Sequence, residues 1–446
     1  MHGAVGAKCS RKRHLGHARD TGSTRPDLRI LTQVNELHPG SVRMDPPPPQ
    51  DFAMTAATFP AEGSVSVRLW LDGNTGAKTI GRAEVAARRP RAVAALVGRR
   101  AEEAVRLAPL LFSLCGTAQG LAVARACEAA LGIDAGAQEI ARRLLTDAEA
   151  LDSHGWQAVV EWPTRLGAPP RPAALRTLRQ AVSAVMPALY PAKDGLRPGG
   201  GVLRPDEVAL RGALDRMNGW LEEEVFAGPV PRDADELARW AGQGAGDAAR
   251  LAARLLDPDL AGWGAGGVPL LSESGPDWFA AALSGDPAFA TRPQHEGGPA
   301  LTGPLERQAA HPLVVSVTER FGDGLARLFA ARLADLAELP RRMEAAIAAL
   351  RPSDPATAAG PAPGSGCGVA ETARGRLAHW LRLDGDGRIT DARMVAPTDW
   401  NFAADGPLAR GLAGAKVDGR DDAEERARLL VAMLDPCVAC GIEVHE

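Results

Sequence analysis

The sequence has few cysteines, little excess charge of either sign and no long apolar run. Six cysteines in 446 residues are too few for a disulfide framework, so we expect a protein of a reducing compartment, the cytoplasm. The net charge of −4 excludes a strong overall attraction to nucleic acid or to acidic membranes. No apolar stretch reaches the roughly 18 residues that a membrane-spanning helix needs, so no membrane span is predicted.

A chain of this length can bury a large core, and its composition divides it into four segments. Residues 1–62 contain several lysines and arginines without a following apolar stretch. This excludes a secretory signal and indicates a disordered tail or a start codon upstream of the real one. Residues 63–350 are expected to form a helical body and residues 351–368 a Pro/Gly/Ala linker or loop. Residues 369–446 are expected to form a β-hairpin and a cysteine-bearing segment that packs on the body.

Hydrophobic periodicity predicts helices over most of the chain and two short β regions. Residues 63–80 alternate apolar and polar side chains and then turn, which predicts a strand that enters a hairpin. A second hairpin is predicted at residues 377–396, with Gly385 and Gly387 in its turn. Helices are predicted over residues 90–113, 120–131, 136–162, 172–190, 318–350 and 423–434, and over 206–255 with an interruption at Gly228-Pro229. Residues 257–312 are expected to be irregular.

Two cysteines near the C-terminus, Cys437 and Cys440, stand in the sequence Asp-Pro-Cys-Val-Ala-Cys. Two thiolates one helical turn apart can bind the same soft metal ion. A redox pair of the thioredoxin type would need a following helix, and only six residues follow Cys440. A structural zinc site would need further ligands, for which His445 and Cys367 are available, and two packed core thiols are a further alternative.

A third cysteine, Cys115, stands where a second pair of this kind would be expected, in Leu-Cys-Gly-Thr-Ala-Gln-Gly. Ala118 occupies the position of the second cysteine of that pair. Since alanine has no donor atom, a site built from both segments would lack one of its four thiolates. Cys127 lies among small apolar residues of a predicted helix and is expected to be a packed core thiol.

Four segments resemble, in order, motifs of the large subunit of nickel–iron hydrogenases. They are residues 302–305, 372–380, 397–401 and 435–440, the last of which resembles the closing DPCxxC signature of that family. The resemblance spans roughly residues 63–446. It implies a fold that is mainly α with small antiparallel β-sheets (α+β), a hydrogenase large-subunit-like helical bundle. In that fold Cys115 would approach Cys437 and Cys440.

The resemblance also implies a metal site, position by position. In the hydrogenases four thiolates hold nickel, and two of them bridge to an iron that carries two cyanides and one carbonyl. Cys115 and Cys437 match the terminal nickel thiolates, and Cys440 matches one bridging thiolate. Ala118 stands at the other bridging position and has no donor to offer.

Two further residues match positions around the metals. Arg374 matches an arginine that lies over the metal pocket, and Thr398 matches a hydroxyl position near the diatomic ligands. Guanidinium and hydroxyl groups can both donate hydrogen bonds to cyanide nitrogens. His379 is expected to be a hydrogen-bonded histidine beside a strand and His445 a solvated one, and Cys367 is not expected to bind metal.

The chain departs from the hydrogenase pattern at positions that carry chemistry. Ser113 stands at an arginine position, Ala122 at a histidine position and Glu443 at the position of the C-terminal histidine. Residues 90–93 lack the carboxylate that relays protons near nickel. A thiolate ligand, the proton-relay carboxylate and the C-terminal histidine of the hydrogenase pattern are therefore all missing.

A chain with these losses looks like the HupK-type hydrogenase expression/formation proteins, which are degenerate relatives of the large subunit. The resemblance implies a non-catalytic maturation protein, a scaffold or carrier for the Fe(CN)2(CO) unit. That unit would be bound transiently by Cys437 and Cys440 with Cys115 as a third donor, and nickel is not expected. The partners would be hydrogenase maturation chaperones and the hydrogenase large subunit. The alternatives are an active nickel-dependent hydrogenase large subunit and a metal-free interaction protein of the maturation machinery.

Overall fold

The described residues are mostly helical, as the hydrophobic periodicity predicted. The structure is a computed structural model that describes residues 63–73, 78–88, 92–272, 274–357 and 364–446, and the predicted tail at residues 1–62 lies outside these ranges. The described residues belong to one compact unit. Among them, no single helix combines the length and the apolarity of a membrane span. One pair of helices, 101–111 and 113–131, meets both criteria together but is bent by 102°.

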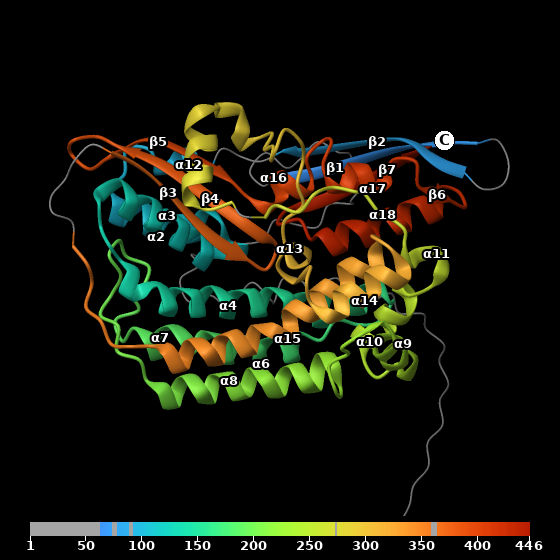
Figure 1. The fold of residues 1–446 in the computed structure, drawn as a ribbon, viewed down its shortest axis with the longest axis horizontal. Helices are drawn as coiled ribbons and strands as arrows, with labels where there is room; N and C mark the ends of the chain where they lie inside the picture. Colours follow the sequence, from blue (N-terminus) through green and yellow to red (C-terminus); the bar gives the residue numbers. More distant parts are fainter. Residues whose placement is uncertain (1–62, 74–77, 89–91, 273, 358–363) are drawn as a thin grey trace, which may run out of the picture. The chain divides into compact units, whose positions relative to one another are not determined.

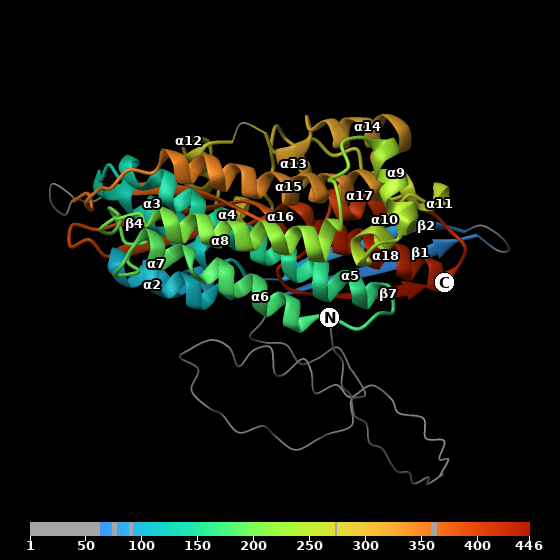
Figure 2. The ribbon, with the colours of Figure 1, turned by 90° about the horizontal axis from the view of Figure 1, so that it is seen from below.

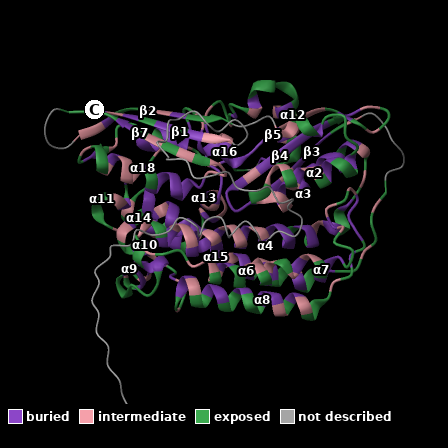
Figure 3. Ribbon diagram, turned by 180° about the vertical axis from the view of Figure 1, so that it is seen from behind, coloured by how far each residue is buried: buried purple, intermediate pink, exposed green. Residues whose placement is uncertain are grey.

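Long helices lie side by side in the helical body (Figures 1 and 2). They are α4 (Glu139–Trp156), α6 (Pro172–Ser183), α8 (Glu207–Leu221) and α15 (Leu325–Ala349), and α15 contacts both α4 and α8. Their apolar residues recur at helical spacing, so each helix turns one face towards its neighbours and another towards solvent (Figure 3). Burial of these faces holds the body together.

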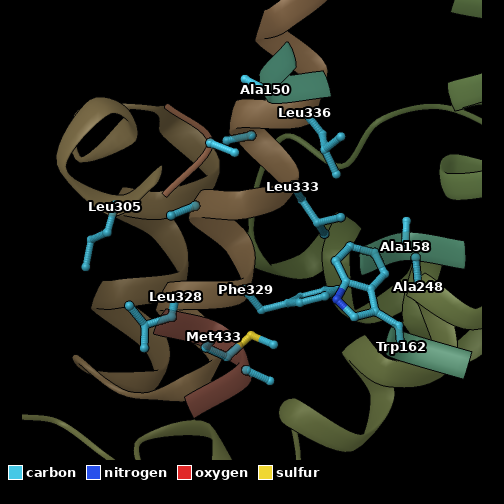
Figure 4. Close-up of a cluster of buried hydrophobic side chains, with 14 of the residues drawn as sticks. Ala150, Ala158, Trp162, Ala248, Leu305, Leu328, Phe329, Leu333, Leu336 and Met433 are labelled. Atoms are coloured by element: carbon cyan, nitrogen blue, oxygen red, sulfur yellow. The ribbon is translucent and has the colours of Figure 1, made fainter. Parts of the chain in front are cut away.

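The end of helix α18 (Arg420–Leu434) is packed into this body. Phe329 of α15 lies against Trp162 with ring centroids 5.4 Å apart, and Met433 of α18 belongs to the same cluster (Figure 4). Full burial of one such side chain contributes about 1.5–3 kcal/mol. Packing of the end of α18 therefore fixes the position of the segment that follows it, and this segment contains Cys437.

The remaining helical elements are shorter and connect these layers. The α-helices are α2 (Ala101–Leu111), α3 (Gly116–Leu131), α5 (Trp162–Arg165), α7 (Val185–Leu189), α9 (Ala234–Gln243), α10 (Asp247–Leu255), α11 (Pro258–Ala261), α12 (Pro276–Gly285), α13 (Pro304–Gln308), α14 (Pro312–Phe321), α16 (Pro397–Asn401) and α17 (Pro407–Leu412). Short 3₁₀ turns are Ala92–Leu96, Ser113–Cys115, Gly136–Gln138 and Pro287–Ala290, and π-helical turns are Gln157–Glu161 and Glu222–Phe226.

One sheet joins the two ends of the described chain. Its strands are β1 (Ser64–Asp72), β2 (Lys78–Arg88), β6 (Lys416–Val417) and β7 (Ala439–His445), in the order β6-β2-β1-β7. Strands β1 and β2 are antiparallel, whereas β7 runs parallel to β1. Every second residue of β1 is buried, as its alternating sequence predicted.

The second sheet packs directly on helix α3. It is antiparallel and contains β3 (Gly364–Thr372), β4 (Gly375–Leu383) and β5 (Ile389–Val395), in that order. Glycines alternate along β3 and face the helix. A Cβ atom at Gly368 would lie 2.0 Å from the carbonyl oxygen of Ala122. The absence of side chains on this face of β3 thus lets the sheet approach α3, which begins beside Cys115.

The predicted fold class, mainly α with small β-sheets, is confirmed, and so are both hairpins. One detail is wrong, because the pairing of β1 with β7 is parallel and not antiparallel. The prediction that residues 364–368 belong to a linker is also wrong, since these residues form the start of β3. The glycine-rich composition of this segment indicated a loop, but the glycines serve the close contact with α3.

Several predicted helices are divided in the structure, and the causes of two breaks are clear. The helix expected at 90–113 is a 3₁₀ turn followed by α2, because residues 98–100 pair with the end of the second hairpin through Gly98 and Ile389. The helix expected at 318–350 is divided between α14 and α15, and Gly322 between them has a positive φ of 82°. The segment 257–312, expected to be irregular, contains α12 and three shorter turns of helix.

We expect Gly368→Ala to destabilise the protein by about 1–3 kcal/mol, because the new methyl group must push α3 away from β3. Thermal unfolding followed by circular dichroism measures the effect. Gly219→Ala in α8 is the matched control, since a Cβ atom there has no neighbour within 4 Å and alanine favours a helix. Equal melting temperatures for Gly368→Ala and the unmodified protein would contradict the close packing.

Candidate metal site

Cys115 lies in the bend between α2 and α3, where a short turn, Ser113–Cys115, precedes the helix. A carboxylate from α4 holds this bend, since Glu149 accepts hydrogen bonds from the backbone N–H groups of Thr117 at 2.6 Å and Ala118 at 3.0 Å. These N–H groups belong to the first turn of α3 and have no partner within the helix. Glu149 thus fixes the start of α3, and with it the position of Cys115.

Cys437 follows the end of α18, where Asp435 adopts a left-handed conformation with φ 54° and ends the helix. Thr398, from the first turn of α16, contacts Cys437 twice. Its Oγ1 lies 3.1 Å from the sulfur and accepts a hydrogen bond from the Cys437 N–H at 3.3 Å. Thr398 is buried, so this contact fixes the position of Cys437.

Arg374, in the turn that joins β3 to β4, is close enough to both thiols to interact with them electrostatically. Its Nε is 3.2 Å from Asp435 Oδ2, and its Nη1 donates a hydrogen bond to Ser153 Oγ at 3.0 Å. Burial opposes the charge of this guanidinium, but Asp435, Cys437 and Cys115 together raise its pKa. Both cysteines therefore interact with the same cation, and the structure brings Cys115, Cys437, Thr398 and Arg374 into one group of interacting side chains, which we call the pocket.

The thiol of Cys115 is strongly held in its protonated form. Burial raises its pKa to about 12, and the neighbouring Cys437 and Glu149 add to this effect. Arg374 and a hydrogen bond from the side chain of Gln119 oppose it. A metal that binds here must therefore displace a proton from Cys115.

Cys440 does not join this pocket. It lies in β7 opposite Val65 of β1, and its charged neighbours are Arg428 and Arg165. Across the described residues, no group of three or more His, Cys, Asp and Glu side chains is placed to hold a metal ion. The expected approach of three thiols is therefore wrong for this conformation. The spacing of Cys437 and Cys440 indicated a helical turn, but the chain is already extended at Ala439 because β1 offers a strand to pair with.

The other residues singled out in the sequence lie elsewhere. Cys127 is buried in α3, and Cys367 is buried in β3 beside Trp380 and Trp400. His445 stacks on Trp70 with ring centroids 5.1 Å apart and stays partly exposed. His379 was expected to be fully hydrogen-bonded, but only its Nε2 has a partner among the described residues.

Several residues of the pocket gave no recognisable signal in the sequence. Glu149, Gln119 and Ser153 come from the interior of α3 and α4, where only the tertiary packing brings them to the thiols. Arg332 of α15 is fully buried; it donates a hydrogen bond to the Met433 carbonyl oxygen at 2.7 Å and lies 3.6 Å from Asp435. The sequence showed Asp435 as part of the Asp-Pro-Cys motif, but it did not predict that Asp435 lies beside both Arg374 and Arg332.

Comparison with known proteins identifies the family. The chain is 32% identical over 378 residues to the hydrogenase expression/formation protein HupK of Rhizobium leguminosarum bv. viciae, covering 81% of this chain and 92% of that protein. It is 33% identical over 356 residues to HupK of Azotobacter vinelandii, covering 78% and 90%. The chain belongs to the HupK family of hydrogenase expression/formation proteins. The nickel-dependent hydrogenase family model matches residues 323–445 of this HupK-family chain.

The fold of the HupK-family chain is that of a hydrogenase large subunit. The Ni-Fe-Se hydrogenase of D. vulgaris Hildenborough in its as-isolated oxidized state aligns with a TM-score of 0.61 and 16% sequence identity, over 82% of this chain and 94% of that one. At this identity the likeness concerns the fold alone. The expected resemblance to the large subunit and to HupK-type proteins is thereby confirmed.

We expect Cys115 to react slowly with iodoacetamide in the folded protein without metal. The attacking species is the thiolate, and a pKa of about 12 in place of 9.0 leaves roughly a thousandfold less of it at pH 8. Peptide mass spectrometry after timed labelling of folded and urea-unfolded protein measures the ratio. Equal labelling rates at Cys115 in the two states would contradict the environment described here.

Proposed function

We propose that this protein is a non-catalytic carrier for the Fe(CN)2(CO) unit during assembly of the large subunit of a nickel–iron hydrogenase. The observation that carries the proposal is the pocket in which Cys115 and Cys437 share the guanidinium of Arg374. The names of the relatives, hydrogenase expression/formation proteins, support a role in maturation. The iron unit as cargo comes from the resemblance of Cys115, Cys437, Arg374 and Thr398 to positions around the metals of the hydrogenase large subunit.

The donors in the pocket suit this cargo. Thiolates are soft ligands and bind iron well. Arg374 is paired through Nε with Asp435 Oδ2 at 3.2 Å and through Nη1 with Ser153 Oγ at 3.0 Å. A guanidinium carries five N–H donors, so it can also donate to a cyanide nitrogen, and the hydroxyl of Thr398 can do the same.

The same pocket is poorly suited to nickel and to permanent retention. Ala118 supplies no thiolate, and Cys440 is held on the sheet by the pairing of β7 with β1. Cargo held by Cys115 and Cys437 has few bonds to break, so its release to a large subunit is favoured. Cys440 can act as a further donor only after the first residues of β7 leave β1, and we assign it a secondary role.

The partners that this role requires are the chaperones that deliver the iron unit and the large subunit that receives it. We place the exchange in a reducing compartment, the cytoplasm, because thiols that serve as metal ligands must stay reduced. A second candidate is a metal-free interaction protein of the maturation machinery. It is favoured by the absence, among the described residues, of three gathered metal ligands, and it predicts that Cys437→Ser leaves hydrogenase maturation intact.

Infrared spectroscopy of protein purified anaerobically from cells that make the cofactor tests the cargo. We expect cyanide and carbonyl bands in the unmodified protein, none in Cys115→Ala or Cys437→Ala, and little change in Cys440→Ala. Cys367→Ala is the matched control, because this thiol is buried in β3 among aromatic side chains, and it should keep the bands. Absence of bands from the unmodified protein would rule out the carrier. Stoichiometric nickel with hydrogen uptake would show an active hydrogenase instead.

Metal binding should also strengthen with pH. Burial raises the pKa of Cys115 to about 12, so binding at lower pH releases a proton from this thiol. Affinity for a thiol-seeking probe such as Co²⁺ is expected to rise about tenfold per pH unit for each thiol deprotonated. Competition with a chelator between pH 6.5 and 8.5 measures the slope. A flat profile would show that the probe does not bind through Cys115.

A further inference from the structure

A buried pair of side chains beside Cys115 has no part in the proposed function so far. Gln119 lies in the first turns of α3, and His379 comes from β4 of the second sheet; both are almost completely buried. His379 Nε2 is 2.6 Å from Gln119 Oε1, and Gln119 Nε2 donates to Cys115 Sγ at 3.6 Å, within hydrogen-bond distance for sulfur. The three side chains therefore form one line of contacts that ends at the thiol.

The position of the imidazole proton follows from these contacts. Burial lowers the pKa of His379 to about 3, so the ring is neutral and carries one N–H. Nδ1 is buried and has no hydrogen-bond partner among the described residues. A proton on Nδ1 would be an unsatisfied buried donor, at a cost of about 1–3 kcal/mol. On Nε2 the proton has an acceptor 2.6 Å away, and the proton therefore resides there.

The imidazole in turn fixes the amide of Gln119. Because Oε1 accepts the hydrogen bond from His379, the NH2 group is the end of the amide that faces Cys115 Sγ. Packing of β3 and β4 on α3 keeps both partners in place. The Cys115 sulfur thus faces the Gln119 NH2 group, whose orientation is set by His379 of the second sheet.

We propose that Gln119 and His379 are positioning residues for Cys115, and that His379 fixes the Gln119 amide so that it directs an N–H group at the metal-bearing sulfur. This inference rests on the proposed function, since it takes Cys115 as a ligand of the cargo. An N–H group at a thiolate withdraws electron density from the sulfur and weakens its bond to a metal. Gln119 and His379 therefore fix the position of the Cys115 thiol for metal binding, and they also favour release of the metal unit.

Four variants separate this role from simple packing. His379→Phe keeps a ring and removes the Nε2 donor, whereas His379→Gln keeps an N–H group near the same place. Gln119→Leu removes the amide that faces the sulfur. Gln138→Leu is the matched control, because Gln138 is equally buried but bonds to Ser353 and Tyr190, residues outside the pocket.

The measurement is the thiolate-to-cobalt charge-transfer absorption of purified protein loaded anaerobically with Co²⁺, together with the rate at which a chelator removes the ion. This needs neither the iron unit nor maturation partners. We expect His379→Phe and Gln119→Leu to shift the band to lower energy and to slow removal several-fold. His379→Gln and Gln138→Leu should match the unmodified protein in both readouts.

The outcomes distinguish the inference from the function on which it rests. If the unmodified protein shows no such band, or one that persists in Cys115→Ala, Cys115 is not a metal ligand and the proposed function fails. If the band depends on Cys115 but is identical in Gln119→Leu and the unmodified protein, the inference alone fails. Gln119→Leu decides the question by itself if β4 does not accept phenylalanine at position 379, which thermal unfolding reveals.

Discussion

The buried ion pair between Arg374 and Asp435 ties together the segments that form the pocket. Arg374 stands in the turn between β3 and β4, and Asp435 ends α18 directly before the segment that carries Cys437. Ser153 of α4 and Arg332 of α15 contact the same two residues from the helical body. Removal of one partner from a buried pair typically costs about 3–5 kcal/mol, so the site and the fold depend on the same contact.

The two thiols reach this ion pair from opposite parts of the sequence. Glu149 fixes the start of α3 and thereby Cys115, and Thr398 fixes Cys437. A pocket built in this way has two soft donors, a cation and a hydroxyl, while Ala118 leaves the position of a further thiolate without a donor. Such a donor set suits a metal unit that is held for a time and passed on. It differs from a permanent nickel centre by the number of bonds that the protein can form.

Much of the pocket could be predicted from the sequence because its residues lie in recognisable segments. Cys115, Arg374, Thr398 and Cys437 each stand in a motif, and the structure brings all four together. Cys440 was misplaced because its spacing from Cys437 is the same whether the chain is helical or extended. Only the parallel pairing with β1, more than 370 positions away in the sequence, decides between them.

Other features of the site have no local signal at all. Glu149 and Gln119 are polar residues within helices, and such residues are usually solvated; only packing of α4 and β4 around α3 turns them towards Cys115. The glycines of β3 indicated a loop because the sequence does not show that they contact a helix. In the structure they allow the close approach of α3, which is distant in the sequence. The chemistry of the site was thus easier to predict than the contacts that hold it.

The central claim is that Cys115 and Cys437 together hold an iron unit without nickel. X-ray absorption at the iron edge of protein isolated anaerobically from cofactor-producing cells tests it most directly. The account predicts sulfur scattering from two thiolates that is unchanged in Cys440→Ala, together with short iron–carbon distances and no nickel edge. A nickel neighbour at the iron, or sulfur scattering that persists when both Cys115 and Cys437 are replaced by alanine, would contradict it.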